Sequence, residues 1–191
     1  MLILASASPR RARILGELGI PFRVVVSAAD ETLRPGEDGA TAVLRLARAK
    51  AAVVAARESL PVLAADTEVV CDGEVLGKPE SVEGAIRMLK RLAGRTHDVV
   101  TGLCLIHGPV ERSGVDRTSV RFAPMNDAEC AWYAETGEPL DKAGGYHVDG
   151  RGGFFIAGLT GSPSNVAGLP VRLLYELARD AGMPLAGPAL S

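Results

Sequence analysis

Short apolar runs alternate with amphipathic stretches along the first half of the chain. A short apolar run bounded by polar or turn residues is typical of a buried strand, whereas apolar positions three and four residues apart indicate a helix with one buried face. The clearest helix is the stretch 41–58, in which Leu44, Ala47, Ala51 and Val54 fall on one face. In chain order, the pattern predicts strands at 2–5, 22–27 and 62–66 and helices at 9–18 and 41–58.

In the second half, residues that typically begin and end helices mark the elements. Ser81 and Gly94 bracket one helix, and Asn126 followed by Glu129 forms the capping box that begins another. Adjacent aromatic residues on that second helix, Trp132 and Tyr133, are expected in the core. The remaining pattern predicts strands at 95–106, 110–122 and 154–159, a final helix at 171–182, and loops at 28–40, 137–153 and 160–170.

This order of elements favours an α/β fold with a mixed sheet that is mostly covered by helices. A tight hairpin is expected at Asp72 and Gly73, which stand between two apolar runs. The chain shows no internal repeat and no long linker, so we expect a single domain over residues 1–183. The last residues, 184–191, are expected to be a disordered tail.

Composition narrows the functional classes. The 191 residues are 47% hydrophobic and 23% charged, with a net charge of −2 at pH 7, which gives no basic field for nucleic acid. The three cysteines, Cys71, Cys104 and Cys130, are widely spaced and predict neither a disulfide framework nor a zinc site. No stretch reaches the roughly 20 apolar residues of a membrane helix, and the first apolar run is too short for a signal peptide. We therefore expect a cytoplasmic protein that binds neither a membrane nor nucleic acid.

Positive charge at the start of the first helix is the first candidate for chemistry. A helix N-terminus already carries partial positive charge, so Arg10 and Arg11 are slightly unfavourable there unless an anion binds. With the hydroxyls of Ser6 and Ser8 and the free N–H groups of the first turn, they would form a phosphate site. Alternatively, both arginines are ordinary solvated residues.

A carboxylate at the end of a buried strand is the second candidate. Asp66 follows an apolar run, and a carboxylate there must be paired, metal-bound or catalytic unless it only caps the next turn. Glu31, Lys50 and Lys78 are individually ordinary. Together with the two arginines, however, these residues have the composition of a metal-assisted phosphoryl-transfer site.

The glycine-rich loop 137–153 is the third candidate. Gly144 and Gly145 allow the backbone to approach a ligand closely, while Asp141, Lys142 and Asp149 offer polar contacts. A wide turn without function is the alternative. His97, His107 and His147 have no metal-ligand spacing, and no nucleophile–base arrangement is recognisable, so covalent catalysis has little support.

Seven segments in a fixed order carry a family resemblance. They are SASPRR (6–11), RLARAKA (45–51), ADTEVV (65–70), LGKP (76–79), THDVVTG (96–102), GEPLDKAGGY (137–146) and NVAGLP (165–170). The chain resembles the Maf family of nucleoside triphosphate pyrophosphatases over almost its whole length. The resemblance implies a two-lobed α/β fold, in which helices flank a mixed sheet around a central cleft, related in plan to the inosine triphosphate pyrophosphatases.

The resemblance also implies an activity and its residues. The expected reaction is hydrolysis of a nucleoside triphosphate to the monophosphate and pyrophosphate, with a divalent cation (Mg²⁺ or Mn²⁺) and commonly a homodimer. By position, Asp66 matches the family's proton acceptor and, with Glu31, its metal-binding carboxylates. The matching charges and phosphate-binding residues are Lys50, Lys78, Ser6, Ser8, Arg10, Arg11 and Lys142.

Substrate choice divides the family into branches. The segments at 8–11, 65–67 and 141–146 resemble the branch that prefers dTTP and UTP, in which Arg10, Thr67 and Asp149 fall on positions tied to the base. That branch usually carries glutamine where Asp149 stands, and an ionised aspartate offers acceptors only. The main rival is a nucleotide-binding regulator of cell division without significant turnover. An inosine triphosphate pyrophosphatase is disfavoured by the SASPRR opening, which lacks that group's usual phosphate loop.

Overall fold

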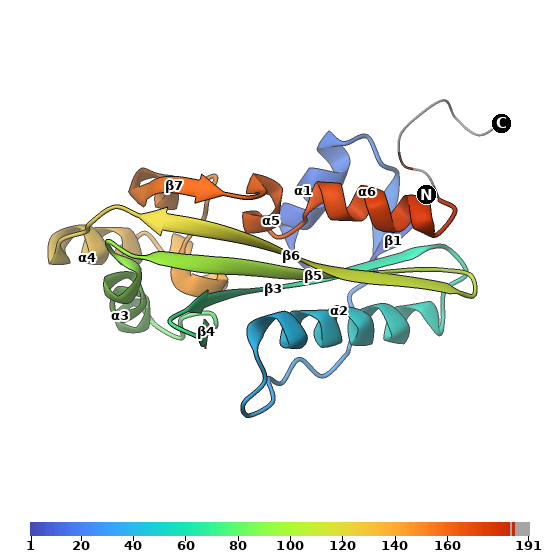
Figure 1. Cartoon of the computed structure of the whole chain (residues 1–191), viewed down its shortest axis with the longest axis horizontal. Coiled ribbons are helices and arrows are strands. Elements are labelled where there is room, and N and C mark those ends of the chain that lie inside the picture. The colour runs from blue at the N-terminus through green and yellow to red at the C-terminus, as the bar shows by residue number, and fades with distance from the viewer. Residues whose placement is uncertain (184, 186–191) are drawn as a thin grey trace.

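A single mixed sheet runs the length of the molecule (Figure 1). The computed structural model describes residues 1–183 and 185, so the predicted tail lies outside the described residues apart from Leu185. The order along the sheet is β2-β1-β3-β5-β6-β7, and β4 pairs with β3. The strands are β1 (Leu2–Leu4), β2 (Phe22–Val24), β3 (Val62–Cys71), β4 (Glu74–Leu76), β5 (Thr96–His107), β6 (Val110–Phe122) and β7 (Ile156–Thr160).

Helices cover both faces of this sheet. In Figure 1, α2 lies below the long strands and α1 and α6 lie above them, whereas α3 and α4 lie at the left-hand end of the sheet. The helices are α1 (Pro9–Glu17), α2 (Gly39–Ala55), α3 (Val82–Leu92), α4 (Asp127–Glu135), α5 (Pro163–Val166) and α6 (Val171–Asp180). Three 3₁₀ helices are η1 (Glu138–Asp141), η2 (Ala143–Gly145) and η3 (Arg151–Phe155). The predicted α/β fold is confirmed, and none of the described helices is both long and apolar enough to cross a bilayer.

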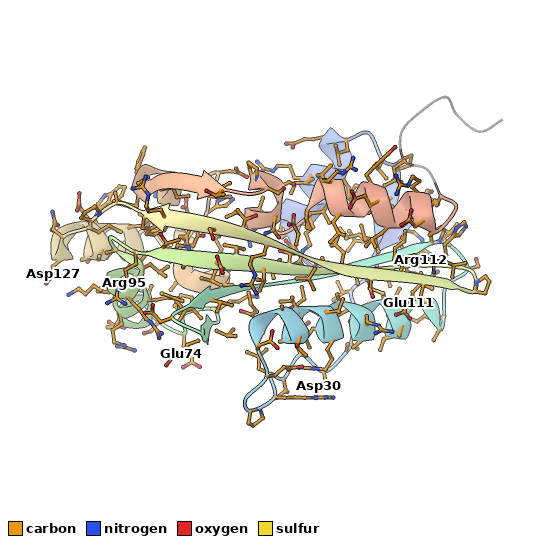
Figure 2. All side chains as sticks on the ribbon, viewed as in Figure 1. Asp30, Glu74, Arg95, Glu111, Arg112 and Asp127 are labelled. Carbon is orange, nitrogen blue, oxygen red and sulfur yellow. The ribbon has the colours of Figure 1, made fainter. Side chains whose placement is uncertain are left out.

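The long strands β3, β5 and β6 carry apolar clusters at both ends. Toward the N-terminal end of β3, one cluster packs the sheet against α1 and α6, and a second packs its opposite face against α2. At the other end, residues of α3, α4 and the segment 143–155 pack on the same strands. Charged side chains such as Asp30, Glu111 and Asp127 point away from these layers (Figure 2).

The predicted helix caps and the predicted hairpin turn are present in the structure. Ser81 accepts a hydrogen bond from the Gly84 N–H, and Asn126 forms the full capping box with Glu129. The hairpin at Asp72 is present, with a positive φ of 52° at that residue. Ser8 stands at the N-cap of α1, but its side chain accepts no capping hydrogen bond.

Other details of the prediction were wrong. Trp132 is 47% exposed and only its neighbour Tyr133 is buried, because α4 turns one face to solvent. On α2, three of the four predicted positions are buried, but Leu44 is only half-buried. The buried face also includes Val43, Leu46 and Lys50. The predicted loops at 137–153 and 160–170 contain η1, η2, most of η3 and α5, because short 3₁₀ turns and a one-turn helix carry no periodic apolar signal.

Candidate active site

A break in the pairing along β3 creates the site. The parallel partner β1 ends at Leu4, opposite Leu63. Along β3, pairing with the antiparallel strand β4 starts only at Val69. Residues 64–68 therefore have no neighbouring strand on that edge, although β5 pairs with β3 throughout. The prediction that Asp66 ends a strand was wrong: Asp66 lies inside β3, beside the carboxyl end of β1. Ligands of α/β proteins typically bind beyond the carboxyl ends of strands.

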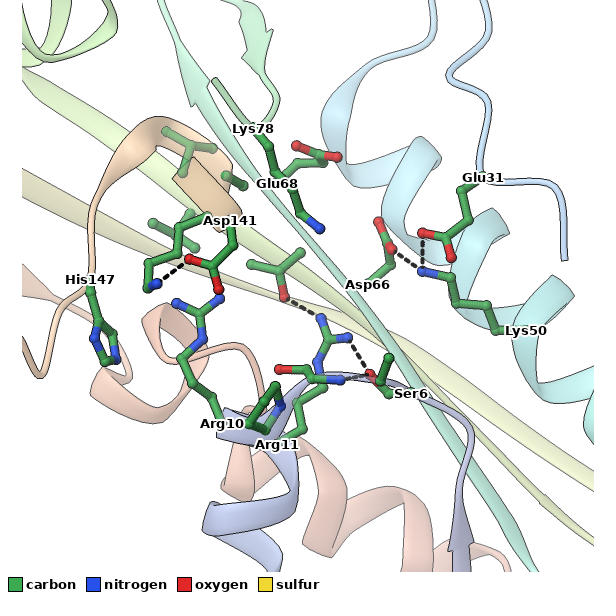
Figure 3. A pocket seen from close by; sticks show the side chains of 18 of the residues that line it. Ser6, Arg10, Arg11, Glu31, Lys50, Asp66, Glu68, Lys78, Asp141 and His147 are labelled. Atoms are coloured by element: carbon green, nitrogen blue, oxygen red, sulfur yellow. Dashed lines mark hydrogen bonds and ion pairs between the residues drawn. The ribbon is translucent and has the colours of Figure 1, made fainter. Parts of the chain in front are cut away.

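A cavity of about 530 Å³ lies over this gap. Its volume is within the usual range for a small-molecule site. The predicted residues that line it are Ser6, Ser8, Arg10, Arg11, Glu31, Lys50, Asp66, Thr67, Lys78 and Lys142. Figure 3 shows most of them converging from α1, α2, β3 and the segment after α4. Residues far apart in the sequence are therefore brought together as one charged cavity.

A lysine between two carboxylates forms the centre of one wall. The Lys50 ammonium donates to Oδ1 of Asp66 at 2.6 Å and to Oε2 of Glu31 at 2.7 Å. Lys50 and Asp66 are buried, whereas the Glu31 side chain is 59% exposed. Because buried charges need partners, this network explains how an amphipathic helix tolerates a lysine on its buried face.

Arg11 is a half-buried cation held by neutral groups. Its Nε donates to the Gly168 carbonyl at 2.8 Å, and its terminal nitrogens donate to the hydroxyls of Ser6 and Thr67, both at 3.0 Å. Burial lowers the pKa of Arg11 to about 10, so the guanidinium is still charged at neutral pH. A partly buried cation whose hydrogen-bond partners are all neutral attracts an anion, and this arrangement is consistent with the predicted phosphate site at the start of α1.

The opposite wall carries Arg10 and the segment after α4. Burial lowers the pKa of Arg10, and the nearby Asp141 and Asp149 carboxylates oppose that shift. Lys142 is buried, contacts Asp141 and donates to the Glu138 carbonyl at 2.9 Å. Asp149 does not line the cavity; it binds Arg13 at 2.6 Å, with both side chains half-exposed.

Sequence reasoning missed Glu68 and His147, which also line the cavity. Burial, reinforced by the neighbouring Asp66, raises the pKa of Glu68 to about 7. Burial, together with the nearby cations Arg10 and Lys142, lowers the pKa of His147. Glu68 could have been found from alternation along the strand, since it follows Asp66 by two residues and so shares its face.

The chemistry of the site fits a divalent cation. Glu31, Asp66 and Glu68 supply the carboxylate oxygens that Mg²⁺ and Mn²⁺ prefer, and the Oε2 oxygen of Glu68 is buried without a hydrogen-bond partner among the described residues. In the described part of the chain, no three acidic, histidine or cysteine side chains converge closely enough to hold a metal as they stand. The Lys50 ammonium instead occupies the space between Glu31 and Asp66.

Fold and site together define an α/β protein with a cleft lined by both basic side chains and carboxylates. The chain belongs to the Maf family, because the family model described as Maf-like protein matches residues 1–181. It is 51% identical over 189 residues to a dTTP/UTP pyrophosphatase of Anaeromyxobacter sp. (strain Fw109-5), covering 96% of this chain and 91% of that protein. It is 52% identical over 186 residues to a dTTP/UTP pyrophosphatase of Myxococcus xanthus (strain DK1622), covering 97% and 94%.

A similar solved structure is the Staphylococcus aureus Ham1 protein. The TM-score is 0.48 at 16% sequence identity, over 64% of this chain and 71% of that one.

Proposed function

We propose that this protein hydrolyses dTTP and UTP to the monophosphate and pyrophosphate. Membership of the Maf family and the relatives named dTTP/UTP pyrophosphatase support this substrate class. The observation that carries the reaction is the buried Asp66–Lys50 pair at 2.6 Å, facing a cavity that also contains Arg11. A carboxylate oriented by a lysine beside an anion site is the arrangement needed to activate water next to a phosphate.

Charge balance in the cavity suits a triphosphate bound with a metal ion. Five cationic side chains (Arg10, Arg11, Lys50, Lys78 and Lys142) face four carboxylates (Glu31, Asp66, Glu68 and Asp141). A protein that only bound nucleotide would gain little from carboxylates that repel its ligand. A divalent cation held among these carboxylates, with Asp66 as one of its ligands, would offset the charge that develops on the leaving pyrophosphate.

The chain's own residues perform the remaining steps. Arg11, Ser6 and the first turn of α1 hold phosphate oxygens, and Lys50 orients the Asp66 carboxylate. Asp66 accepts a proton from water as the water oxygen bonds to the α-phosphorus. The bond from that phosphorus to the oxygen bridging it to the β-phosphorus then breaks, and Lys78 stabilises the departing pyrophosphate. We further propose that Arg10 and Thr67 contact the base end of the substrate, with Asp149 nearby.

Product analysis on a nucleotide panel tests this proposal. Purified protein is incubated with Mg²⁺ and dTTP, UTP, CTP, 7-methyl-GTP or ITP, and pyrophosphate is distinguished from orthophosphate. We expect pyrophosphate chiefly from dTTP and UTP. Release chiefly from other bases would keep the reaction but reject the pyrimidine preference. Nucleotide binding without release would favour the regulator instead.

A further inference from the structure

Among the described residues, Glu68 is the one cavity carboxylate that forms no ion pair. It is half-buried, and its Oε2 oxygen is fully enclosed without a hydrogen-bond partner among the described residues. Buried carboxylate oxygens are normally hydrogen-bonded or paired, because an unpartnered one loses its hydration without compensation. A group of this kind on the wall of a charged cavity is therefore explained best by a bound partner.

The other cavity carboxylates already have cationic partners. Glu31 and Asp66 share Lys50, and Asp141 contacts Lys142. Lys50 uses only the Oδ1 oxygen of Asp66, and no hydrogen bond joins the Oδ2 oxygen to another described residue. Figure 3 shows this second oxygen on the side of Asp66 that faces away from Lys50 and Glu31, toward Glu68 and Lys78.

Strand geometry places Asp66 and Glu68 on one face. They are two residues apart on β3, so their side chains point to the same face. Neither β1 nor β4 pairs with this part of β3, and both side chains line the cavity over the unpaired edge. Two carboxylates in this relation repel each other unless a cation lies between them. Oxygen ligands from adjacent positions on one strand suit Mg²⁺ or Mn²⁺, which commonly bind one or two carboxylates together with phosphate oxygens.

We propose that Glu68 is a ligand of the divalent cation, which it shares with the free oxygen of Asp66. This inference rests on the proposed function, since the cation is the one that accompanies the triphosphate. It places the cation on the Glu68 side of Asp66, while Lys50 continues to hold the Asp66–Glu31 side. In this proposal Glu68 is unpartnered in the protein because its partner is the cation.

Direct Mn²⁺ binding tests the assignment without measuring turnover. Calorimetric titrations compare the unaltered protein, Glu68→Gln, and the control Glu74→Gln, which changes an exposed carboxylate on β4 paired with Arg91. Each titration is made alone and with α,β-imido-dUTP, whose nitrogen bridge resists hydrolysis. Even residues that merely support a metal ligand affect affinity by about 10–100-fold, so loss of a ligand should weaken Mn²⁺ binding by at least about 10-fold. Glu74→Gln should bind like the unaltered protein.

Thermal melting separates a ligand from a structural residue. Without metal, Glu68→Gln should melt at the same temperature as the unaltered protein or higher, because an unpartnered charge has been removed. Adding Mn²⁺ and the analogue should then raise its melting temperature less. Glu68→Asp keeps a carboxylate and should bind Mn²⁺ with intermediate affinity, and it serves as the test if the glutamine variant does not fold.

Two results would overturn the assignment. One is an unchanged Mn²⁺ affinity in Glu68→Gln, or in Glu68→Asp if the glutamine variant does not fold. The other is an unaltered protein that binds no Mn²⁺ with or without the analogue. Weakened binding in a protein that releases no pyrophosphate would instead reject the proposed function and leave the metal site standing. Pyrophosphate release with unchanged metal affinity would reject Glu68 alone.

Discussion

At the scale of single residues, the proposed reaction depends most on Asp66. Asp66→Asn keeps the shape of the side chain but removes its ability to accept a proton. A positioned general base typically contributes about 10²–10⁴-fold in rate, so we expect kcat to fall by that amount while nucleotide binding measured without a divalent cation remains largely intact. Steady-state pyrophosphate release measures the first quantity and equilibrium binding of α,β-imido-dUTP the second.

Asp180→Asn, at the end of α6, is a suitable control because that carboxylate is exposed and lies outside the cavity. The Asp66 variant's melting temperature is also needed, because the buried Lys50 would retain only Glu31 as a charged partner. Near-normal turnover in a folded Asp66→Asn protein would remove Asp66 from the mechanism.

Residue types could be predicted from the sequence, but residue partners could not. Asp66 and Lys50 were singled out because a charge within an apolar pattern must be paired or bound when it is buried. Arg11 was singled out because a cation at the start of a helix is unfavourable unless an anion binds there. That Arg13 binds Asp149 could not be predicted, because the pair is separated by 136 residues in the chain. Glu68 was missed because β3 was expected to end at Asp66, which concealed the alternation that places both carboxylates on one face.

At the scale of elements, the contact between α2 and β5 fixes the position of Lys50. Gly102 in β5 lies under α2 so closely that an added Cβ would be 2.4 Å from the Val43 carbonyl oxygen. The obstructing atoms belong to the helix backbone, which cannot rotate aside. Gly102→Ala should therefore lower the free energy of unfolding by about 1–3 kcal/mol and reduce turnover by displacing Lys50.

Gly16→Ala provides the matched control for that substitution. Gly16 is in α1, and a Cβ there would meet no atom within 4 Å. Alanine in a helix is favoured over glycine by about 0.5–1 kcal/mol, so this variant should be as stable as the unaltered protein or more so. Urea denaturation measures both variants; equal stability of the two would show that α2 can shift away from β5 at little cost.

Elements with strong local signals were predicted correctly, and elements that depend on tertiary contacts were not. The caps of α3 and α4 and the hairpin at Asp72 follow from short-range hydrogen bonds and backbone preferences. Helices η1 and η3, by contrast, are joined by Glu138, which accepts hydrogen bonds from Tyr133 and from the N–H groups of Arg151 and Gly152. Contacts between separate turns of this kind leave no periodic pattern in the sequence.

At the scale of the whole molecule, a buried histidine links the sheet to the cavity wall. His97 on β5 shares a hydrogen bond with the Tyr146 hydroxyl at 2.9 Å and packs edge-on against Phe122. Tyr146 in turn lines the cavity. Burial lowers the pKa of His97 to about 4, so the imidazole is neutral at pH 7 and its Nδ1 is enclosed without a partner among the described residues.

This depressed pKa predicts how stability depends on pH. An unfolded histidine has a pKa of about 6.5, so as pH falls from there toward 4 the unfolded chain binds a proton that the folded protein does not. His97 should therefore lower the free energy of unfolding progressively across that window, by at most about 3 kcal/mol, and contribute no slope above it. His97→Gln should remove this contribution while leaving a side chain that can still hydrogen-bond to Tyr146.

The difference between the two proteins isolates His97, because Glu68 and His147 titrate in both. Urea denaturation of each between pH 4 and pH 8 gives the two curves. The difference in stability should be constant above pH 7 and should shift in favour of His97→Gln as the solution is acidified. A difference that stays flat down to pH 4 would mean that His97 is protonated equally in both states. The buried His97, which bonds to Tyr146 on the cavity wall, would then contribute nothing to the pH dependence of stability.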